Sequence, residues 1–281
     1  MGTELCNVAQ AFQQRRRGDR GDRSVLSYKE YTQKQCDYLN ATPGHLTGYD
    51  CAICKNKGVV YFVGDDDEIR AKPCQCREIR NSMKRIQSSG LETLLNCCTF
   101  ESFQTDMLLQ KKMKQTALEF LEDCDGKWFF AGGQSGAGKT HICTAIAGEL
   151  LRRGKSVRYM LWNDESVRIK AAIHDEFEYA KLVDPLKKVS VLYIDDLFKP
   201  VKDETGVRKQ PNPGDIRLAF ELLNFRYIHP DLITIISSEW TIDELQDIDP
   251  AIGGRVYQRS KDYCLTISRE EYKNYRLHGA K

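Results

Sequence analysis

The stretch KWFFAGGQSGAGKTHICTAIAGELLRRG, residues 127–154, decides the fold. It begins with a short apolar run that ends in glycine, which is typical of a buried strand. Gly133–Thr140 then fits the pattern G-x-x-x-x-G-K-[ST] in full, and the residues after it place apolar side chains at helical spacing as far as Gly154. Because the pattern follows a strand and opens a helix, it predicts a phosphate-binding loop rather than a chance glycine-rich turn.

The residue types in this loop match what a nucleoside triphosphate and its metal ion require. Glycines let backbone N–H groups turn inward around phosphate oxygens, and the start of the helix adds unpaired donors and a positive dipole end. Lys139 supplies a positive charge for the β and γ phosphates, and Thr140 supplies a hydroxyl for Mg²⁺. The expected contacts for ATP are Gly133, Gln134, Ser135, Gly136, Ala137, Gly138, Lys139, Thr140 and His141.

Beyond the loop, apolar strands alternate with helical segments. The expected strands are SVRYMLW (156–162), VSVLYIDDL (189–197) and LITIISSE (232–239), and the expected helices are 108–123, 165–183 and 216–228. The strand at 189–197 is too apolar to face water, as is usual in the middle of a parallel sheet. The alternation predicts an α/β fold with a parallel sheet flanked by helices.

Two adjacent acids follow the apolar residues of the strand at 189–197. Ligands of parallel α/β sheets bind at the carboxyl ends of the strands, so these acids are expected beside the phosphate-binding loop. We expect Asp195 to hold Mg²⁺ through its water shell, together with Thr140, and Asp196 to polarise the attacking water. The alternative for Asp196 is a structural role at the end of the strand.

Four of the eleven cysteines form two close pairs ahead of this domain. Cys51 and Cys54 are spaced C-x-x-C, and Cys74 and Cys76 are spaced C-x-C. The residues between the pairs have the length and the pattern of a hairpin, which would bring both pairs around one tetrahedral ion. Four thiolates without a nearby histidine favour structural Zn²⁺. Labile disulfides, free thiols and an iron–sulfur cluster are the alternatives.

Composition sets outer limits on the function. No apolar run approaches the roughly 20 residues that a membrane helix needs, and the N-terminal residues lack the apolar core of a signal peptide. We therefore expect a cytoplasmic protein without a membrane partner, in which paired cysteines bind metal more often than they form disulfides. The net charge of +2 means that contacts with nucleic acid would come from local basic patches.

The expected organisation has four parts. Residues 1–48 are polar and helical, with helices at 4–17 and 24–39, residues 49–80 form the cysteine module, residues 81–104 are a linker, and residues 105–281 form the nucleotide-binding domain. The cysteine module is too short to bury the apolar area that an independent fold needs, so a metal ion would supply the missing stability.

Several spaced features together resemble the AAA+ ATPases of the DnaC/DnaI helicase-loader group, which are related to the IstB transposition ATPases. The resemblance covers roughly residues 49–276. It rests on TFESF (99–103), GGQSGAGKTH (132–141), YIDDL (193–197), LLNFRY (222–227), ITIISSE (233–239), GGRVYQR (253–259) and EYKNYR (271–276).

The resemblance implies three further site residues. The polar sensor of the family falls on Ser238, where the family usually has asparagine. The arginine that reaches a neighbouring subunit's nucleotide falls on Arg255 or Arg259, and the second sensor arginine falls on Arg276. An arginine suits these roles because its permanent charge and planar fork match phosphate oxygens.

The resemblance also implies a function. We expect an Mg²⁺-dependent ATPase that assembles as a homo-oligomer and loads a replicative DNA helicase onto single-stranded DNA, with the zinc module gripping the helicase. Expected DNA contacts are Arg168, Lys170 and the basic loop 199–213, and Trp162 and Trp240 are stacking candidates if they do not belong to the core. The alternatives are an IstB-like transposition ATPase and an adaptor that binds ATP without hydrolysing it.

Overall fold

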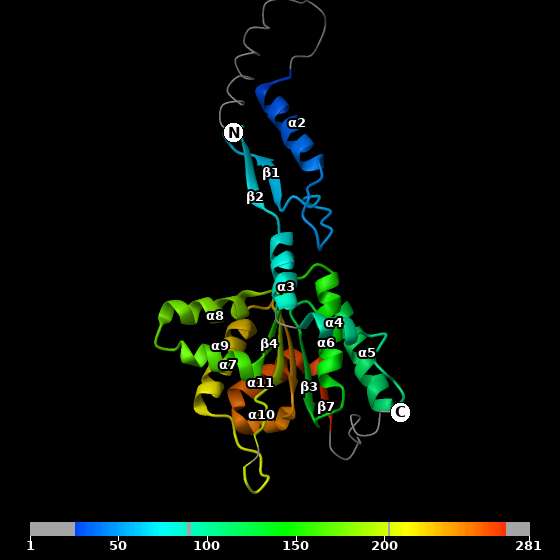
Figure 1. The fold of residues 1–281 in the computed structure, drawn as a ribbon, viewed down its shortest axis with the longest axis vertical. Coiled ribbons are helices and arrows are strands. Elements are labelled where there is room, and N and C mark those ends of the chain that lie inside the picture. Colours follow the sequence, from blue (N-terminus) through cyan, green and yellow to red (C-terminus); the bar gives the residue numbers. More distant parts are fainter. Residues whose placement is uncertain (1–25, 89–90, 202, 268–281) are drawn as a thin grey trace, which may run out of the picture. The chain divides into compact units, whose positions relative to one another are not determined.

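A computed structural model describes residues 26–88, 91–201 and 203–267 of the 281-residue chain (Figure 1). The described chain divides into two compact units. The first comprises residues 26–46 and 50–74, and the second comprises residues 47–49 and 75–267 apart from the gaps. The helix predicted at 4–17 lies outside the described residues.

The first unit consists of a helix and a hairpin. Helix α2 (Tyr28–Ala41) begins with a capping box, in which the Ser27 and Glu30 side chains bond each other's backbone N–H groups. Strands β1 (Val59–Val63) and β2 (Ile69–Pro73) form the antiparallel hairpin that the sequence predicts between the cysteine pairs. The side-chain amide of Asn40 joins helix and hairpin, because it donates to the carbonyl of Tyr61 and accepts from its N–H.

Two lysines satisfy the end of α2, and one of them, Lys55, donates to the Ala41 carbonyl over 3.0 Å. The Lys57 ammonium donates to the carbonyl oxygens of Leu39, Asn40 and Thr42. The last carbonyls of a helix have no partner inside the helix, and a cation also interacts favourably with the negative end of the helix dipole. Lys57 itself lies in the turn after Cys54, because its N–H donates to the Cys54 carbonyl over 3.1 Å.

The second unit contains the predicted parallel sheet. Its strand order is β4-β5-β6-β3-β7, and all neighbouring strands run parallel. The strands are β3 (Trp128–Gly133), β4 (Val157–Leu161), β5 (Val191–Leu197), β6 (Ile233–Ser238) and β7 (Cys264–Ile267). The fold class is therefore confirmed, while β7 at the edge of the sheet was not predicted.

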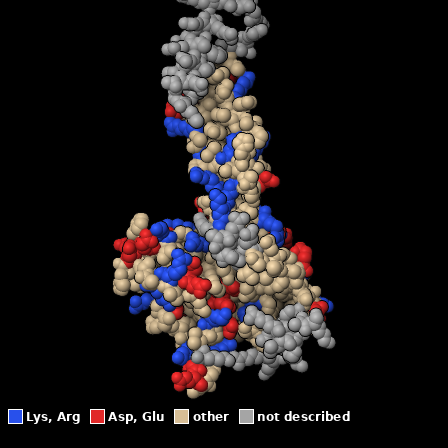
Figure 2. Space-filling view, viewed as in Figure 1, with Lys and Arg blue, Asp and Glu red and all other residues tan. Residues whose placement is uncertain are grey.

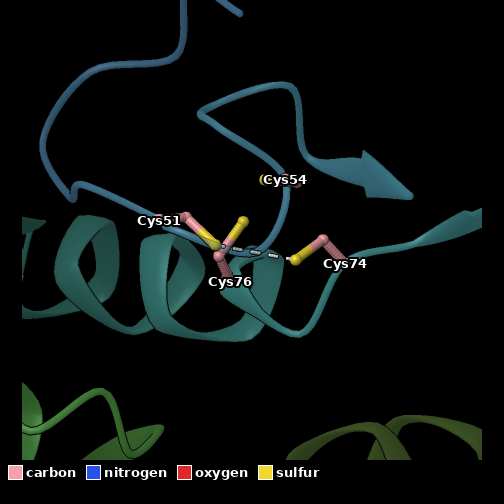
Figure 3. Close-up of side chains that lie close together, drawn as sticks. All are labelled: Cys51, Cys54, Cys74 and Cys76. Atoms are coloured by element: carbon pink, nitrogen blue, oxygen red, sulfur yellow. Dashed lines mark hydrogen bonds between the residues drawn. The ribbon is translucent and has the colours of Figure 1, made fainter. Parts of the chain in front are cut away.

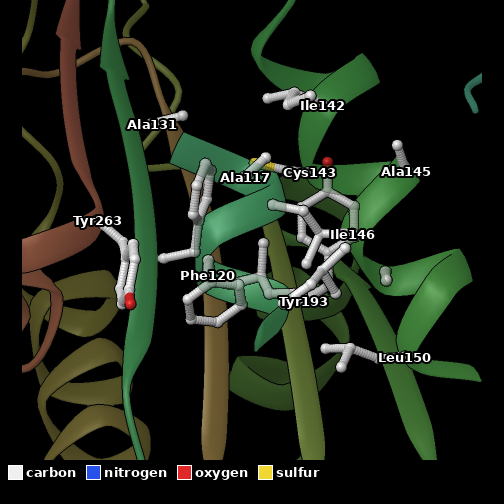
Figure 4. Close-up of a cluster of buried hydrophobic side chains, with 14 of the residues drawn as sticks. Ala117, Phe120, Ala131, Ile142, Cys143, Ala145, Ile146, Leu150, Tyr193 and Tyr263 are labelled. Atoms are coloured by element: carbon white, nitrogen blue, oxygen red, sulfur yellow. The ribbon is translucent and has the colours of Figure 1, made fainter. Parts of the chain in front are cut away.

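Helices cover both faces of this sheet (Figure 1). Side chains alternate along the central strands, so Phe129 and Tyr193 face one core while Phe130 and Ile194 face the other. Helices α5 (Leu108–Glu122) and α6 (Lys139–Arg152) close the first core, shown in Figure 4. The second core is closed by α7 (Trp162–Ala171), α8 (Glu176–Lys188), α9 (Pro213–Ile228), α10 (Ile242–Ile248) and α11 (Pro250–Ser260).

Two further helices and one 3₁₀ turn connect the elements described above. Helices α3 (Cys76–Ser88) and α4 (Leu91–Cys97) precede the TFESF segment, and a 3₁₀ turn at Lys261–Tyr263 leads into β7. The helix predicted at 165–183 is two helices, because Asp175 caps a new start by accepting from the N–H of Glu178.

Arg226 is a fully buried charge that joins α9 to the start of β6 and to the end of α8. Its Nε donates to Thr234 Oγ1 over 2.9 Å, and Nη2 donates to the Ile233 carbonyl over 2.5 Å. Its Nη1 donates to three carbonyls at the end of α8, those of Leu186, Lys187 and Val189. Burial lowers the pKa of Arg226 to about 9, so the guanidinium stays charged at neutral pH.

Replacing Arg226 should destabilise the second unit strongly. We expect Arg226→Met to lower the free energy of unfolding by about 3 kcal/mol or more, because several buried carbonyls lose their donor. The exposed Arg217 on the same helix is the matched control, and Arg217→Met should change stability by less than about 0.5 kcal/mol. Denaturant unfolding followed by circular dichroism measures both, and equal effects would contradict the role given to Arg226.

Candidate nucleotide site and cysteine cluster

The phosphate-binding loop begins where β3 ends and finishes where α6 begins. Gly133 has φ +108° and packs against the edge strand, because a Cβ there would collide with the carbonyl of Ile267. The next residue is tied to the same carbonyl, since the Gln134 N–H donates to it over 3.1 Å. Glycine is therefore required at this position by both conformation and space.

Lys139 is buried at the first position of α6 and folds over the loop. Its ammonium donates to the carbonyl oxygens of Gly133 and Gln134 over 2.9 and 2.6 Å. Burial lowers the pKa of Lys139, while the negative charges of Glu239 and Asp196 oppose this shift. The Lys139 ammonium thus lies within the loop and is bound to two carbonyl oxygens, which phosphate oxygens could replace.

Four hydroxyl groups surround the Asp195 carboxylate. Oδ1 accepts hydrogen bonds from Tyr193 over 2.8 Å, from Thr140 over 3.2 Å and from Ser237. Oδ2 accepts a bond from Tyr159 over 3.0 Å. The structure therefore brings together Thr140 and Asp195, the two residues predicted to hold Mg²⁺.

A bulge sets the position of Asp196. Ile194 pairs with Ile236, but the next pair is Leu197 with Ser238, so β5 has one residue more than β6 in this interval. Asp196 takes the left-handed conformation at φ +56°, and its N–H donates to Ser237 Oγ over 2.9 Å. Its carboxylate accepts from the Lys199 ammonium over 2.7 Å. The side chain predicted to polarise water is therefore in an ion pair.

Ser237 and Ser238 are the last two residues of β6, and Ser238 is the residue predicted as the polar sensor. Ser238 is buried, and its Oγ donates to the Leu197 carbonyl over 2.7 Å rather than to either acid. Its neighbour Ser237 contacts Asp195 instead. Glu239 follows directly, and its carboxylate exerts the largest charge effect on Lys139, ahead of Asp196 and Asp195.

The two arginines on α11 are bound within their own chain. Arg255 Nε donates to Asn224 Oδ1 over 3.0 Å, and its guanidinium lies over the Phe220 ring at 5.0 Å. Arg259 Nη1 donates to the Tyr227 carbonyl over 3.3 Å. Within the described ranges, neither arginine bonds the phosphate-binding loop or the two acids. Arg276 lies outside the described residues.

The TFESF segment lies against the start of α6. His141 Nε2 is 3.0 Å from the Thr99 carbonyl and 3.3 Å from Ser102 Oγ. The Phe103 ring meets the His141 ring edge-on with centroids 5.1 Å apart, and it would also contact a Cβ at Gly138. The TFESF segment therefore fixes the ring of His141, a predicted nucleotide contact on α6, through contacts that come from outside that helix.

The expected DNA contacts have partners inside the fold. Lys170 is paired with Asp215 at 2.5 Å, and Arg168 is paired with Glu165 at 3.2 Å. Trp162 and Trp240 are 1% and 5% exposed, so both belong to the core and neither offers a face for stacking. Figure 2 shows basic and acidic side chains interspersed on the visible face of the second unit.

Sequence patterns did not reveal five of the residues at this site. Tyr193 was within reach of prediction, because it lies two residues before Asp195 and therefore on the same face of β5. Tyr159 could not be found without the register of β4, and Ser237 could not be found without the bulge. The positions of Lys199 and Glu239 depend on the loops that follow β5 and β6. The five residues are Tyr159, Tyr193, Lys199, Ser237 and Glu239.

The four predicted cysteines form one cluster (Figure 3). All four side chains are buried, and their sulfur atoms lie within 4.8 Å of one another. The sulfurs of Cys51 and Cys74 are 3.8 Å apart, which matches the spacing of about 3.8 Å that Zn–S bonds of about 2.3 Å give in a tetrahedron. This donor set fits structural Zn²⁺, and all four cysteines are free of disulfides.

The turn after Cys54 supports a thiolate at that position. Lys55 and Asn56 both take left-handed conformations, with φ of +48° and +66°. The turn directs the Gly58 N–H toward Cys54 Sγ over 3.2 Å, and the Asn56 side chain accepts from the Cys51 N–H over 2.9 Å. An N–H group that donates to sulfur stabilises the charged form of the thiol and orients it, as outer partners do at metal sites.

The sequence model of the "IstB-like ATP binding protein" family matches residues 67–248, which is more than half of the chain. The chain belongs to this family. The match confirms the predicted relation to IstB proteins, and it covers the phosphate-binding loop, both acids and Ser237.

Two relatives in Bacillus subtilis span most of the chain. The uncharacterized protein YqaM is 31% identical over 280 residues, covering 82% of this chain and 86% of its own length. The phage-like element PBSX protein XkdC is also 31% identical, with coverage of 83% and 88%.

Replication proteins show similarity over shorter stretches. The replicative helicase loader DnaC of Escherichia coli K12 is 29% identical over 163 residues, which is 55% of this chain and 62% of DnaC. The crystal structure of DnaI aligns with a TM-score of 0.50 at 21% identity, covering 63% of this chain and 93% of DnaI. That alignment shows a shared fold.

The length and composition of the helices show whether any of them could span a membrane. Across the described ranges, every helix is too short or too polar to cross a bilayer.

The cysteine cluster should bind one Zn²⁺ per chain. We expect the double substitution Cys51→Ser/Cys74→Ser to abolish zinc binding, because two of the four ligands are lost. The exposed Cys97 provides the control, and Cys97→Ser should keep a full equivalent. Elemental analysis of freshly purified protein measures zinc, and less than about half an equivalent in the unaltered chain would contradict the assignment.

Lys139 and Asp195 should affect nucleotide chemistry differently. Lys139→Ala removes the charge that faces the β and γ phosphates, so ATP binding should weaken and hydrolysis should fall by about 100-fold or more. Asp195→Ala should reduce Mg²⁺-dependent turnover more than it reduces binding. The exposed Lys112 is the control for charge. Steady-state hydrolysis and equilibrium binding decide the matter, and normal turnover by the Lys139 variant would refute the site.

Proposed function

We propose that this protein is an ATP-dependent loader of a ring-shaped replicative DNA helicase, which acts on single-stranded DNA when replication begins. The observation that carries the proposal is that one chain combines a nucleotide-binding site with a four-cysteine cluster. A phosphate-binding loop lies opposite Asp195 in the second unit, and the same chain carries a cluster of four cysteines within residues 51–76. Similarity to the replicative helicase loader DnaC over 55% of the chain supports it.

The nucleotide site has the groups that ATP hydrolysis requires. The triphosphate would lie on the loop, with Lys139 exchanging its carbonyl partners for β and γ phosphate oxygens. Mg²⁺ would be held by Thr140 and Asp195 and would neutralise charge on the phosphates. Asp196 would accept a hydrogen bond from the attacking water and so polarise it, once the Lys199 ammonium leaves its carboxylate.

Assembly of several subunits would complete each site. Arg255 and Arg259 are bound within their own chain and do not reach their own phosphate-binding loop. We assign one of the two to a neighbouring subunit's nucleotide, a contact that forms when subunits stack, and we assign Arg276 to the second sensor. Such an arginine compensates charge that develops in the transition state. Activity would therefore depend on protein concentration and on DNA or helicase that promotes assembly.

The first unit would contact the helicase. Its exposed large apolar or aromatic side chains include Tyr38, Ile53 and Phe62, which are 68%, 54% and 40% exposed. Metal bound by the cysteines would keep the hairpin and the turn after Cys54 rigid, so these side chains would be presented without a large entropy cost on binding.

Two other functions fit particular observations. The ion pair between Asp196 and Lys199 favours an adaptor that binds ATP and does not hydrolyse it. The family match favours an IstB-like ATPase that acts in transposition. Hydrolysis that responds to single-stranded DNA argues against the adaptor, and binding to a replicative helicase argues against the transposition role.

The helicase contact can be tested with the full-length chain. A tagged protein in extract of the cells that produce it should retain the replicative helicase, identified by mass spectrometry. Ile53→Asp/Phe62→Asp should lower the retained helicase at least tenfold, because charge at the centre of an apolar contact prevents docking.

Phe177→Asp is the matched control, since Phe177 is 76% exposed and lies in the second unit. This variant should retain the helicase fully, and all variants should bind ATP normally. If the double variant retains as much helicase as the unaltered chain, or if no helicase is retained by any of them, the proposed function is wrong.

A further inference from the structure

The hydrogen bonds to Asp195 are divided unequally between its two oxygens. Oδ1 accepts from Thr140, Tyr193 and Ser237, and Oδ2 accepts from Tyr159. Thr140 is the other residue assigned to Mg²⁺, so Oδ1 lies on the side where the ion would bind. Oδ2 is therefore the rear oxygen, and among the described residues Tyr159 is the hydrogen-bond donor that reaches it.

The position of Tyr159 follows from the register of the sheet. Tyr159 on β4 pairs with Tyr193 on β5, and Leu161 pairs with Asp195. The two tyrosine rings meet edge-on at 5.2 Å, so the ring of Tyr159 is fixed by packing as well as by its hydroxyl. Asp195 thus receives one phenol from its own strand and one from the neighbouring strand.

The ring and the hydroxyl of Tyr159 make separate contacts. The ring packs against the core, while the hydroxyl reaches the Asp195 carboxylate. Removing the hydroxyl alone therefore separates its effect on Asp195 from its contribution to packing.

We propose that Tyr159 is a positioning residue that holds the Asp195 carboxylate in the orientation that Mg²⁺ requires. This inference rests on the proposed use of Mg²⁺-ATP. Rotation about the Cβ–Cγ bond displaces both oxygens, so the donor on Oδ2 adds to the restraint that the three donors on Oδ1 provide, and it does so without occupying the oxygen on the side of Thr140. Outer partners of this kind typically change metal affinity by about 10- to 100-fold when they are lost.

Tyr159→Phe in the full-length protein tests the role. Binding of a fluorescent ATP analogue is titrated at a series of Mg²⁺ concentrations and also in excess EDTA. The half-saturating Mg²⁺ concentration should rise about tenfold, while affinity for the analogue in EDTA should stay within twofold of the unaltered chain. Circular dichroism should show the same fold and a melting temperature that is nearly unchanged, because the ring is retained.

Tyr179→Phe is the matched control. The Tyr179 hydroxyl also donates to a carboxylate, that of Glu221 over 2.5 Å, but this pair joins α8 to α9. Its removal should leave the Mg²⁺ titration unchanged. A Tyr159 variant whose Mg²⁺ requirement lies within twofold of the unaltered chain overturns the proposal, and so does equal weakening in EDTA.

The outcomes also separate this inference from the proposed function. If the unaltered chain fails to bind the ATP analogue, the proposed function itself is refuted, and the role of Tyr159 falls with it. If the unaltered chain binds the analogue in an Mg²⁺-dependent manner and the Tyr159 variant behaves identically, the role of Tyr159 alone is refuted.

Discussion

The contact between the phosphate-binding loop and the edge strand β7 is the constraint on which the nucleotide site depends. The Ile267 carbonyl accepts the Gln134 N–H and occupies the space where any side chain at Gly133 would lie. The loop therefore leaves β3 in one direction, and α6 begins with Lys139 over its mouth and Thr140 toward Asp195. A strand of four residues at the sheet edge thus fixes the loop that follows the neighbouring strand β3.

Parts of this arrangement could be predicted because short patterns carry them. The strand, glycine-rich turn and helix around Lys139 are contiguous, and the acids of VLYIDDL end an apolar strand. Likewise, the four cysteines could be grouped because a hairpin of suitable length separates their pairs. Each of these predictions needed nothing beyond local spacing, and the sheet and the sulfur cluster confirm the fold and the grouping.

The residues that were missed depend on long-range register or on local irregularity. The bulge in β5 shifts the alignment with β6 by one residue, so Ser237 rather than Ser238 contacts Asp195. Tyr159 reaches the same acid through the pairing of β4 with β5, which no single segment encodes. Trp162 and Trp240 illustrate a third limit, since an aromatic residue at the end of a strand is equally compatible with surface stacking and with a core.

Lys57, whose ammonium binds the last carbonyls of α2, has a consequence for how the first unit unfolds. Lys57 belongs to the same turn as Cys54, yet its ammonium satisfies the last carbonyls of the helix. A unit this small has little core, so the metal-binding turn and the helix end depend on one short segment of backbone. If the cysteine cluster holds Zn²⁺ as we expect, loss of the ion would release the turn, and the helix would fray from its C-terminal end. Metal occupancy and helix order would then be coupled through Lys57.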